Sequence, residues 1–278
     1  MKPDPSRAVV ITGGAGGIGA AMVRALVQDG WHVAAVGRSA TSLDTLRDGL
    51  DASLRARLLC IAADVGDPGT PQRIDDATAE RGWSVAVVIH NAAVPRRGHN
   101  GDMFTAAARF WEVDPVEWDA AFRINTTGAY LLSRHFAPRM MQAGWGRFIH
   151  IATSMHTMVA GGTSPYGPSK SAFESLASIM AYDMAGTGVT SNLIAPGGMV
   201  DTPFLPEHPT IARKDMLRPE VMVPPTRYLM SSAADGISGV RITARLWPAD
   251  MPPEQAFAKS SAPAAWRSLA GDRVDLKK

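Results

Sequence analysis

The sequence predicts an α/β fold in which a doubly wound parallel sheet of about seven strands carries helices on both faces. Two observations predict this class. Short, β-branched apolar runs bounded by Gly, Asp or Asn alternate with longer helical stretches through the first 245 residues. Such runs are typical of strands that are buried on both faces. A chain of 278 residues that is 46% hydrophobic can also enclose one large core.

The expected elements follow this alternation in order. In the first helix, Ile18, Met22 and Leu26 recur at helical spacing, and Gly30 follows where a C-cap is expected. Two long connections, 95–116 and 198–218, follow predicted strands, where an open α/β sheet holds its ligands. The predicted strands are 8–12, 32–37, 58–63, 85–90, 147–151, 190–194 and 239–243, and the predicted helices are 17–28, 41–48, 71–81, 117–143, 166–185 and 219–231.

The chain is expected to form a single domain over residues 1–245, followed by a C-terminal extension over residues 246–278. The composition of the extension changes to Pro, Ala and Ser. Its large apolar side chains are spaced as anchors, at Trp247, Phe257, Trp266 and Leu269. We therefore predict that the extension packs on the body or on a neighbouring subunit. Its composition leaves a disordered extension open as the alternative.

Composition argues against several function classes. The 28 Lys and Arg residues nearly balance 26 Asp and Glu, and no basic run is present, so nucleic-acid binding is not expected. The single cysteine, Cys60, excludes an internal disulfide and a multi-thiolate zinc site, and no metal is expected. No apolar stretch approaches the roughly 18 residues of a membrane span, and no signal-peptide pattern begins the sequence. A cytoplasmic protein without a membrane partner is therefore expected.

A glycine-rich turn directly follows the first predicted strand and opens the first predicted helix. It reads Thr12-Gly13-Gly14-Ala15-Gly16-Gly17-Ile18-Gly19. Glycines let the backbone turn tightly and approach a pyrophosphate, which binds at a helix N-terminus because free N–H groups and the helix dipole favour an anion there. In this context of strand, turn and amphipathic helix, the motif predicts a dinucleotide-binding site.

The end of the second predicted strand indicates which dinucleotide is bound. An NAD site normally has an Asp or Glu there for the ribose 2′-hydroxyl. This chain has Gly37, followed by Arg38 and Ser39. No acid repels a 2′-phosphate, and a guanidinium can bind one through paired, charged hydrogen bonds. The pattern favours NADP(H), with NAD(H) as the alternative.

A tyrosine and a lysine share one face of the helix expected at 166–185. Tyr166 and Lys170 are four residues apart, so a phenol and an ammonium can serve one site. Thr153 and Ser154 follow the fifth predicted strand, 13 and 12 residues before Tyr166. Because a nearby ammonium favours the phenolate, we expect Lys170 to lower the pKa of Tyr166, as a tyrosine general acid/base requires.

With these motifs the chain resembles the short-chain dehydrogenases/reductases, in their shorter, single-domain, NAD(P)-dependent branch with a Rossmann-like fold. The resemblance covers residues 7–245 and identifies Asn125 as the family's helix asparagine. Ala93 departs from the family pattern, since it replaces a glycine after Asn91. The resemblance implies cofactor binding by Gly13, Gly17, Ile18, Gly19, Arg38, Ser39, Asp64, Val65, Asn91, Ala92, Tyr166, Lys170, Pro196, Gly197 and Thr202.

The resemblance also implies a mechanism. Tyr166 would donate or accept the substrate proton, and Thr153 would hold the carbonyl oxygen. Lys170 would bind the nicotinamide ribose, and Asn125 would hold a water that links Lys170 to solvent. A hydride would pass between NADP(H) and a small or medium carbonyl or alcohol substrate. Ser154 stays open as the alternative hydroxyl, because the family usually has Ser where this chain has Thr153.

Assembly and two competing functions complete the expectations. Family members commonly pack their long helices, here 117–143 and 166–185, against copies of themselves, so a homodimer or homotetramer is expected. A cofactor-binding sensor or scaffold without activity stays open on the sequence alone. A relative of the sugar-nucleotide epimerases and dehydratases is the other alternative.

Two histidines end predicted strands. His90 and His150 have no metal-ligand spacing, and we expect both to be hydrogen-bonded structural residues.

Overall fold

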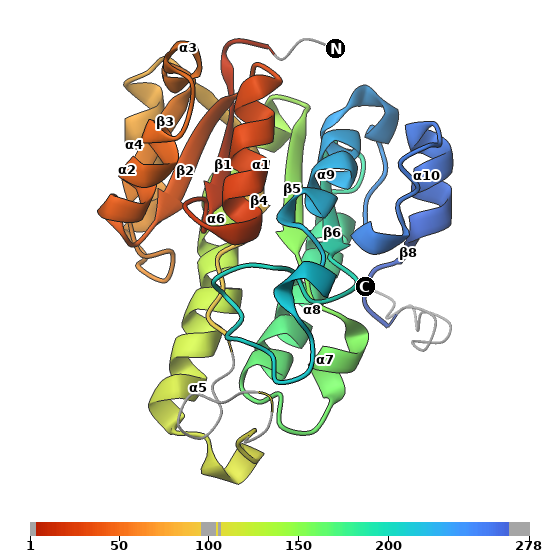
Figure 1. Ribbon diagram of the computed structural model, residues 1–278. Coiled ribbons are helices and arrows are strands. Elements are labelled where there is room, and N and C mark those ends of the chain that lie inside the picture. The colour runs from red at the N-terminus through yellow and green to blue at the C-terminus, as the bar shows by residue number, and fades with distance from the viewer. Residues whose placement is uncertain (1–3, 96–103, 105–106, 267–278) are drawn as a thin grey trace, which may run out of the picture.

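An eight-stranded sheet forms the centre of the computed structural model, which describes residues 4–95, 104 and 107–266 (Figure 1). The strand order is β3-β2-β1-β4-β5-β6-β7-β8. The first seven strands pair in parallel, and β8 pairs antiparallel with β7. This confirms the doubly wound α/β fold and adds one strand to the expected set. The strands are β1 Arg7–Thr12, β2 His32–Gly37, β3 Leu58–Ala62, β4 Ser84–His90, β5 Gly146–Ile151, β6 Val189–Ala195, β7 Val240–Thr243 and β8 Ser261–Pro263.

Helices cover both faces of the sheet. Helices α1, α2 and α9 contribute to the apolar core on one face, and α4, α6 and α8 to the core on the other. Along β1, Val9 and Ile11 belong to the first core and Val10 to the second, so the strand is apolar throughout. The helices are α1 Gly17–Gln28, α2 Ala40–Asp48, α3 Ala52–Arg55, α4 Thr70–Ala79, α5 Pro115–Phe122, α6 Gly128–Gln142, α7 Met155–Val159, α8 Tyr166–Asp183, α9 Val223–Met230 and α10 Pro253–Ser260.

The helix expected at 117–143 is interrupted. A π-helical turn, Arg123–Thr127, separates α5 from α6 and contains the buried Asn125. Thr126 Oγ1 donates to the carbonyl of Ser169 at 2.9 Å, which ties this turn to α8. π-Helical turns inside α-helices are frequent at functional sites. The expected helix at 219–231 likewise begins as a 3-10 turn, Pro219–Met222, before α9.

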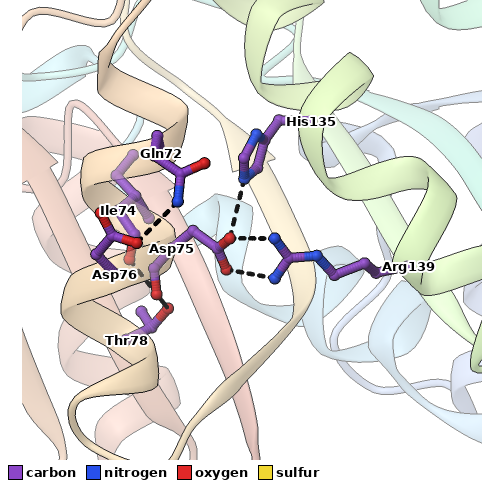
Figure 2. Close-up of polar contacts among 7 residues, drawn as sticks. All are labelled: Gln72, Ile74, Asp75, Asp76, Thr78, His135 and Arg139. Carbon is purple, nitrogen blue, oxygen red and sulfur yellow. Dashed lines mark hydrogen bonds and ion pairs between the residues drawn. The ribbon is translucent and has the colours of Figure 1, made fainter.

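A charged cluster joins α4 to α6 on one face of the sheet (Figure 2). The carboxylate of Asp75 accepts hydrogen bonds from Arg139, at 2.7 Å to Nη1, and lies 3.1 Å from Nε2 of His135. Burial by itself would raise the pKa of Asp75, but its hydrogen bonds with Arg139 and His135 outweigh burial and lower it. The cluster joins α4 to α6 through these hydrogen bonds.

The described part of the C-terminal extension, residues 246–266, packs on the body. The ring of Phe257 on α10 stacks on Tyr228 of α9, with centroids 5.0 Å apart. Ala256 and Ala264 are fully buried, and β8 extends the sheet beyond β7. Residues 261–263 also join the sheet, because their backbone pairs with the edge of β7. Residues 267–278, with the expected anchor Leu269, lie outside the described residues.

Parallel strands bring their carboxyl ends to one edge of the sheet. These ends point to the lower half of Figure 1, where α5 and α7 lie. The expected site residues follow β1, β2, β3, β4, β5 and β6, so the fold brings them to this edge. Within the described ranges, no helix is long and apolar enough to cross a membrane.

Candidate active site

The glycine-rich turn connects β1 to α1 and cannot carry side chains at most of its positions. Gly13 and Gly17 have φ angles of +63° and +50°, a region that L side chains rarely adopt. A Cβ on Gly19 would lie 2.1 Å from the carbonyl oxygen of Gly13, and one on Gly13 would lie 2.9 Å from Nδ2 of Asn91. A Cβ on Gly16 would meet no other atom within 4 Å, so the turn is open on that side.

Two neutral side chains hold this turn in place. Thr12 Oγ1 accepts hydrogen bonds from the backbone N–H groups of Asn91 and Ala92, each at 3.0 Å. Asn91 Nδ2 donates to the carbonyl oxygens of Thr12 and Gly13, at 2.9 and 3.1 Å. The expected cofactor residues Asn91 and Ala92 are thus fastened to the turn from the end of β4.

The start of α1 fits the pyrophosphate of a dinucleotide. Its N-cap is Gly16, which supplies no side-chain hydrogen bond, and the first turn of α1 has no acidic residue. The first N–H groups of a helix lack partners within the helix, and the helix dipole adds positive potential. Ile18 packs its side chain against the core, which leaves its backbone for the ligand. An anion is the ligand that this open, uncapped helix start favours.

Two residues that are expected to bind the adenosine end of the cofactor, Ser39 and Asp64, have hydrogen-bond partners within the protein. Arg38 is exposed directly after β2, and Ser39 Oγ caps α2 by accepting from the N–H of Ser42 at 3.1 Å. Asp64 accepts from Nη2 of Arg123 at 2.9 Å and from a backbone N–H. Burial raises the pKa of Asp64, but the Arg123 hydrogen bond and nearby positive charges, including Arg38, lower it overall. Val65 is buried beside it.

The segment after β6 closes against the glycine turn. The carbonyl of Pro196 accepts from the N–H of Arg245 at 2.9 Å, which fixes the segment to the end of β7. Gly197 has a φ of +83°, and a Cβ there would lie 2.6 Å from Thr243 Cγ2. The buried Thr202 reaches the turn, since a Cβ on Gly17 would lie 2.8 Å from Thr202 Cγ2. The structure therefore brings Pro196, Gly197 and Thr202 to the edge of the sheet where the turn lies.

The two candidate hydroxyls after β5 have different surroundings. The Thr153 side chain lies beside the Tyr166 hydroxyl and acts on the pKa of that phenol as a hydrogen-bonding partner. Ser154 Oγ instead caps α7, since it accepts from the N–H of Thr157 at 3.0 Å and lies 2.7 Å from the Thr157 hydroxyl. In this structure Thr153 is the hydroxyl that faces Tyr166.

Burial dominates the electrostatics of the Tyr166–Lys170 pair. Burial raises the pKa of Tyr166 to about 12, against the lowering effect of its hydrogen bond with Thr153. Burial lowers the pKa of Lys170 to about 7. Lys170 Nζ donates to the carbonyl of Ile151 at 2.9 Å and lies 5.9 Å from the centroid of the Tyr166 ring. Lys170 is not among the causes that set the pKa of Tyr166 here, because desolvation of the phenol dominates. The expected lowering by Lys170 stays a prediction.

Comparison with known proteins fits this geometry. The family model described as short chain dehydrogenase matches residues 7–210. The chain belongs to the short-chain dehydrogenase/reductase family. The chain is 30% identical to the 2-(R)-hydroxypropyl-CoM dehydrogenase of Xanthobacter autotrophicus, over 72% of this chain and 76% of that relative. It is 27% identical to a chloroplastic NADPH-dependent aldehyde reductase-like protein of Arabidopsis thaliana, over 73% and 76%.

A solved structure shows the same fold. The 3-ketoacyl-(acyl-carrier-protein) reductase of Brucella melitensis, complexed with NADH, superposes with a TM-score of 0.72 at 20% identity, over 85% of this chain and 96% of that one. Short-chain dehydrogenases/reductases are NAD(P)-dependent oxidoreductases that act on alcohol and carbonyl groups, and this enzyme shares that activity.

The side chain of Asn125 in this short-chain dehydrogenase forms hydrogen bonds with other residues of the protein. Its Oδ1 accepts from the N–H of Val94 at 2.8 Å, and its Nδ2 donates to Ser169 Oγ at 2.9 Å. These bonds link the segment after β4 to α8, one residue from Lys170. A cavity of about 10 Å³, lined by Asn125 and His90 among others, has room for about one water molecule.

The two strand-end histidines are hydrogen-bonded, as expected. His90 Nε2 lies 2.9 Å from Ser133 Oγ, and His150 Nε2 lies 3.0 Å from Ser191 Oγ. Their rings stack, with centroids 4.9 Å apart. Burial, followed by the charge of Lys170, lowers the pKa of His90 to about 3, and burial likewise lowers that of His150 well below its ordinary value. Both rings are therefore neutral at physiological pH.

Three residues near the site were missed by the sequence analysis. The ring of Phe204, in the 198–218 connection, lies 6.0 Å from that of Tyr166 and forms part of its surroundings. Glu174 and Arg241 form a buried ion pair behind Thr153. A charged residue inside the apolar run of predicted strand 239–243 was the one available signal, since a buried charge needs a partner.

Proposed function

We propose that this enzyme passes a hydride between NADP(H) and a small or medium carbonyl or alcohol substrate, with Tyr166 as the general acid/base. The observation that carries the proposal is the placement of the Thr153 side chain beside the Tyr166 hydroxyl, with Lys170 one turn further along α8. The nicotinamide cofactor, when bound, supplies or accepts the hydride.

The proton chemistry follows from the side chains. With its pKa raised to about 12, Tyr166 is protonated at neutral pH and is poised to donate to a carbonyl oxygen as that oxygen gains charge. Thr153 is placed to share the same oxygen and orient it. Lys170, whose pKa is lowered to about 7, lies close enough to bind a ribose hydroxyl and to change the charge beside Tyr166. Asn125 acts as a positioning residue, since its side chain holds Val94 and Ser169.

The preference for NADP(H) over NAD(H) rests on Arg38. Its side chain is exposed immediately after β2, where a 2′-phosphate would lie, and Gly37 leaves no carboxylate on the strand end. The proposed contacts to the rest of the cofactor come from the glycine turn, Asp64, Val65 and the segment from Pro196 to Thr202. The chloroplastic relative is named for NADPH dependence, which supports the proposal.

We also propose a homodimer or homotetramer. Tyr130 on α6, and Ile179 and Tyr182 on α8, are 47%, 53% and 59% exposed. Apolar surface of this kind on two long helices supports packing against a copy of the chain. Native mass spectrometry distinguishes this assembly from a monomer. The expected cytoplasmic location stays a prediction.

A substrate panel tests the proposed function. Purified enzyme is mixed with NADPH and a series of aldehydes and ketones, or with NADP⁺ and the matching alcohols, and the absorbance of reduced nicotinamide is followed. We expect turnover of at least one small or medium pair in both directions, faster with NADP(H) than with NAD(H). Absence of turnover across the panel, with cofactor binding intact, would contradict the proposal.

A further inference from the structure

A buried ion pair lies directly behind Thr153. Glu174 follows Lys170 by one turn of α8, and its carboxylate is fully buried. Arg241, within β7, is 8% exposed. Arg241 Nη1 pairs with the carboxylate of Glu174, and its Nη2 donates to the backbone carbonyl of Thr153. Arg241 therefore connects α8, β7 and the segment that carries Thr153.

The C-terminal extension completes this arrangement. The backbone N–H of Ala265 donates to Oε1 of Glu174 at 3.1 Å. Ala265 has a φ of +54°, the one positive value at a non-glycine residue of the described chain. Such a conformation costs an L-residue energy and persists where the surroundings hold it. Here the neighbouring Ala264 is fully buried in an apolar cluster that includes Ala152, the residue before Thr153.

The hydrogen bonds of Glu174 and Arg241 restrain both side chains. Both carboxylate oxygens of Glu174 have partners, one from Arg241 and one from Ala265. A buried ion pair holds its geometry because separating the partners leaves a buried charge uncompensated. In the ladder between β7 and β8, Arg241 lies opposite Ala262, so the extension also lies along the backbone of Arg241.

We propose that Glu174 and Arg241, closed by Ala264 and Ala265 of the extension, position Thr153 for the reaction. Neither charged residue bonds the Tyr166 hydroxyl, so both are positioning residues that act through the backbone of Thr153. This inference rests on the proposed function, because it takes Thr153 as the hydroxyl that orients the substrate oxygen. Placement matters there, since a displacement of about 1 Å can cost roughly a hundredfold in rate.

A double-mutant cycle tests the charged pair. Glu174→Leu and Arg241→Met are made together, so that neither charge is left buried alone, in the otherwise unchanged chain and in the Thr153→Ala chain. The substrate is the carbonyl compound that the unchanged enzyme reduces fastest with NADPH. We expect the pair replacement to lower kcat by about tenfold or more when Thr153 is present, and by less than about twofold when Thr153 is absent. The Kd for NADPH stays within about twofold in all four proteins.

The control and the contrary outcomes are distinct. Asp75→Asn with Arg139→Gln removes the more exposed ion pair of Figure 2, which joins α4 to α6 outside the Glu174–Arg241 network, and leaves kcat unchanged. An equal loss of kcat from Glu174→Leu/Arg241→Met in both backgrounds, or no loss in either, overturns the positioning proposal alone. If Thr153→Ala by itself turns over like the unchanged enzyme, the hydroxyl assigned in the proposed function is wrong, and the positioning proposal is overturned with it.

A second comparison tests the extension in the full-length chain. Ala264→Asp puts a carboxylate into the cluster beside Ala152, whereas Ala258→Asp makes the same change at an exposed position of α10 in the same extension. We expect Ala264→Asp to lower kcat by about tenfold with the NADPH Kd unchanged, because Thr153 loses its support. Equal kcat values for these two variants would show that the extension does not position Thr153.

Discussion

The glycine turn, which we propose binds the cofactor, and the proposed proton-transfer site lie at the same edge of the sheet, but they are built from different chemical groups. The turn consists of glycines, and its backbone is held by the neutral side chains of Thr12 and Asn91. The proton-transfer site gathers buried ionisable groups, namely His90, His150, Tyr166, Lys170, Glu174 and Arg241.

This difference determines which substitutions should impair each region, and whether cofactor binding or turnover is lost first. The turn has no space for an added atom at Gly19, so steric changes should damage cofactor binding first. The proton-transfer site depends on which groups carry charge, so changes of charge or pH should damage turnover first. The two regions should therefore be separable by substitution.

The largest expected effect is on turnover, from Tyr166→Phe. This change removes the transferable proton but keeps the ring, so kcat/KM should fall by roughly 10² to 10⁴-fold. The Kd for NADPH, measured by calorimetry, should change by less than about twofold, since the substitution removes only the hydroxyl and keeps the ring in place. Lys170→Ala should impair both quantities, because its ammonium is assigned to the ribose as well as to the proton step. An unchanged kcat/KM in Tyr166→Phe would contradict the assignment of proton transfer to Tyr166, and with it the separation of turnover from cofactor binding.

The matched effect on binding comes from Gly19→Ala. Its Cβ would lie 2.1 Å from a backbone oxygen, so the turn must shift, and overpacking of this kind costs about 1–3 kcal/mol. NADPH and NADH should both bind at least about tenfold more weakly, and the melting temperature should fall. Gly16→Ala is the control for stability, because its Cβ would meet no other atom within 4 Å. Equal melting temperatures for the two variants would mean that the turn is less rigid than its contacts indicate.

A smaller and more selective effect is expected from Arg38→Ala. Loss of a charged hydrogen bond of about 1.5–3 kcal/mol should weaken NADPH binding about ten- to a hundredfold and leave NADH binding unchanged. Titration of both cofactors against both proteins measures this. If the unchanged enzyme binds NADPH and NADH equally, the assignment of Arg38 is wrong.

The smallest effect at neutral pH is expected from the two strand-end histidines, which act on acid stability instead. The folded pKa of His90, about 3, lies below the ordinary value of 6.5, and that of His150 is also lowered. The unfolded chain therefore binds more protons as the pH falls below about 6.5, and stability is lost from there downward. His90→Gln with His150→Gln should move the midpoint of acid unfolding to lower pH, as followed by circular dichroism. The exposed His156→Gln serves as the control.

Local signals explain what could be predicted from the sequence. The seven parallel strands and the glycine turn depend on residues close together in the chain, and Tyr166 and Lys170 share one turn of α8. The interruption of the expected helix 117–143 at Asn125 could not be predicted in this way. The side chain of Asn125 forms hydrogen bonds with Val94 and Ser169, which are distant in the sequence.

Contacts between distant segments explain what was missed. The pair of Glu174 and Arg241 joins α8 to β7, and Ala265 reaches it from a segment whose composition indicates no strand. The raised pKa of Tyr166 has the same origin, since burial depends on the assembled core rather than on the neighbouring Lys170.

Transfer of an isotopic label tests the central claim most directly. NADPH in which both hydrogens on the reactive nicotinamide carbon are replaced by deuterium is incubated with the enzyme and the carbonyl compound that it reduces fastest, and the product is examined by mass spectrometry and NMR. The account predicts a single deuterium on the carbinol carbon, and no labelled product from Tyr166→Phe over the same period. Alcohol product without the label, or equal labelling by Tyr166→Phe, would contradict it.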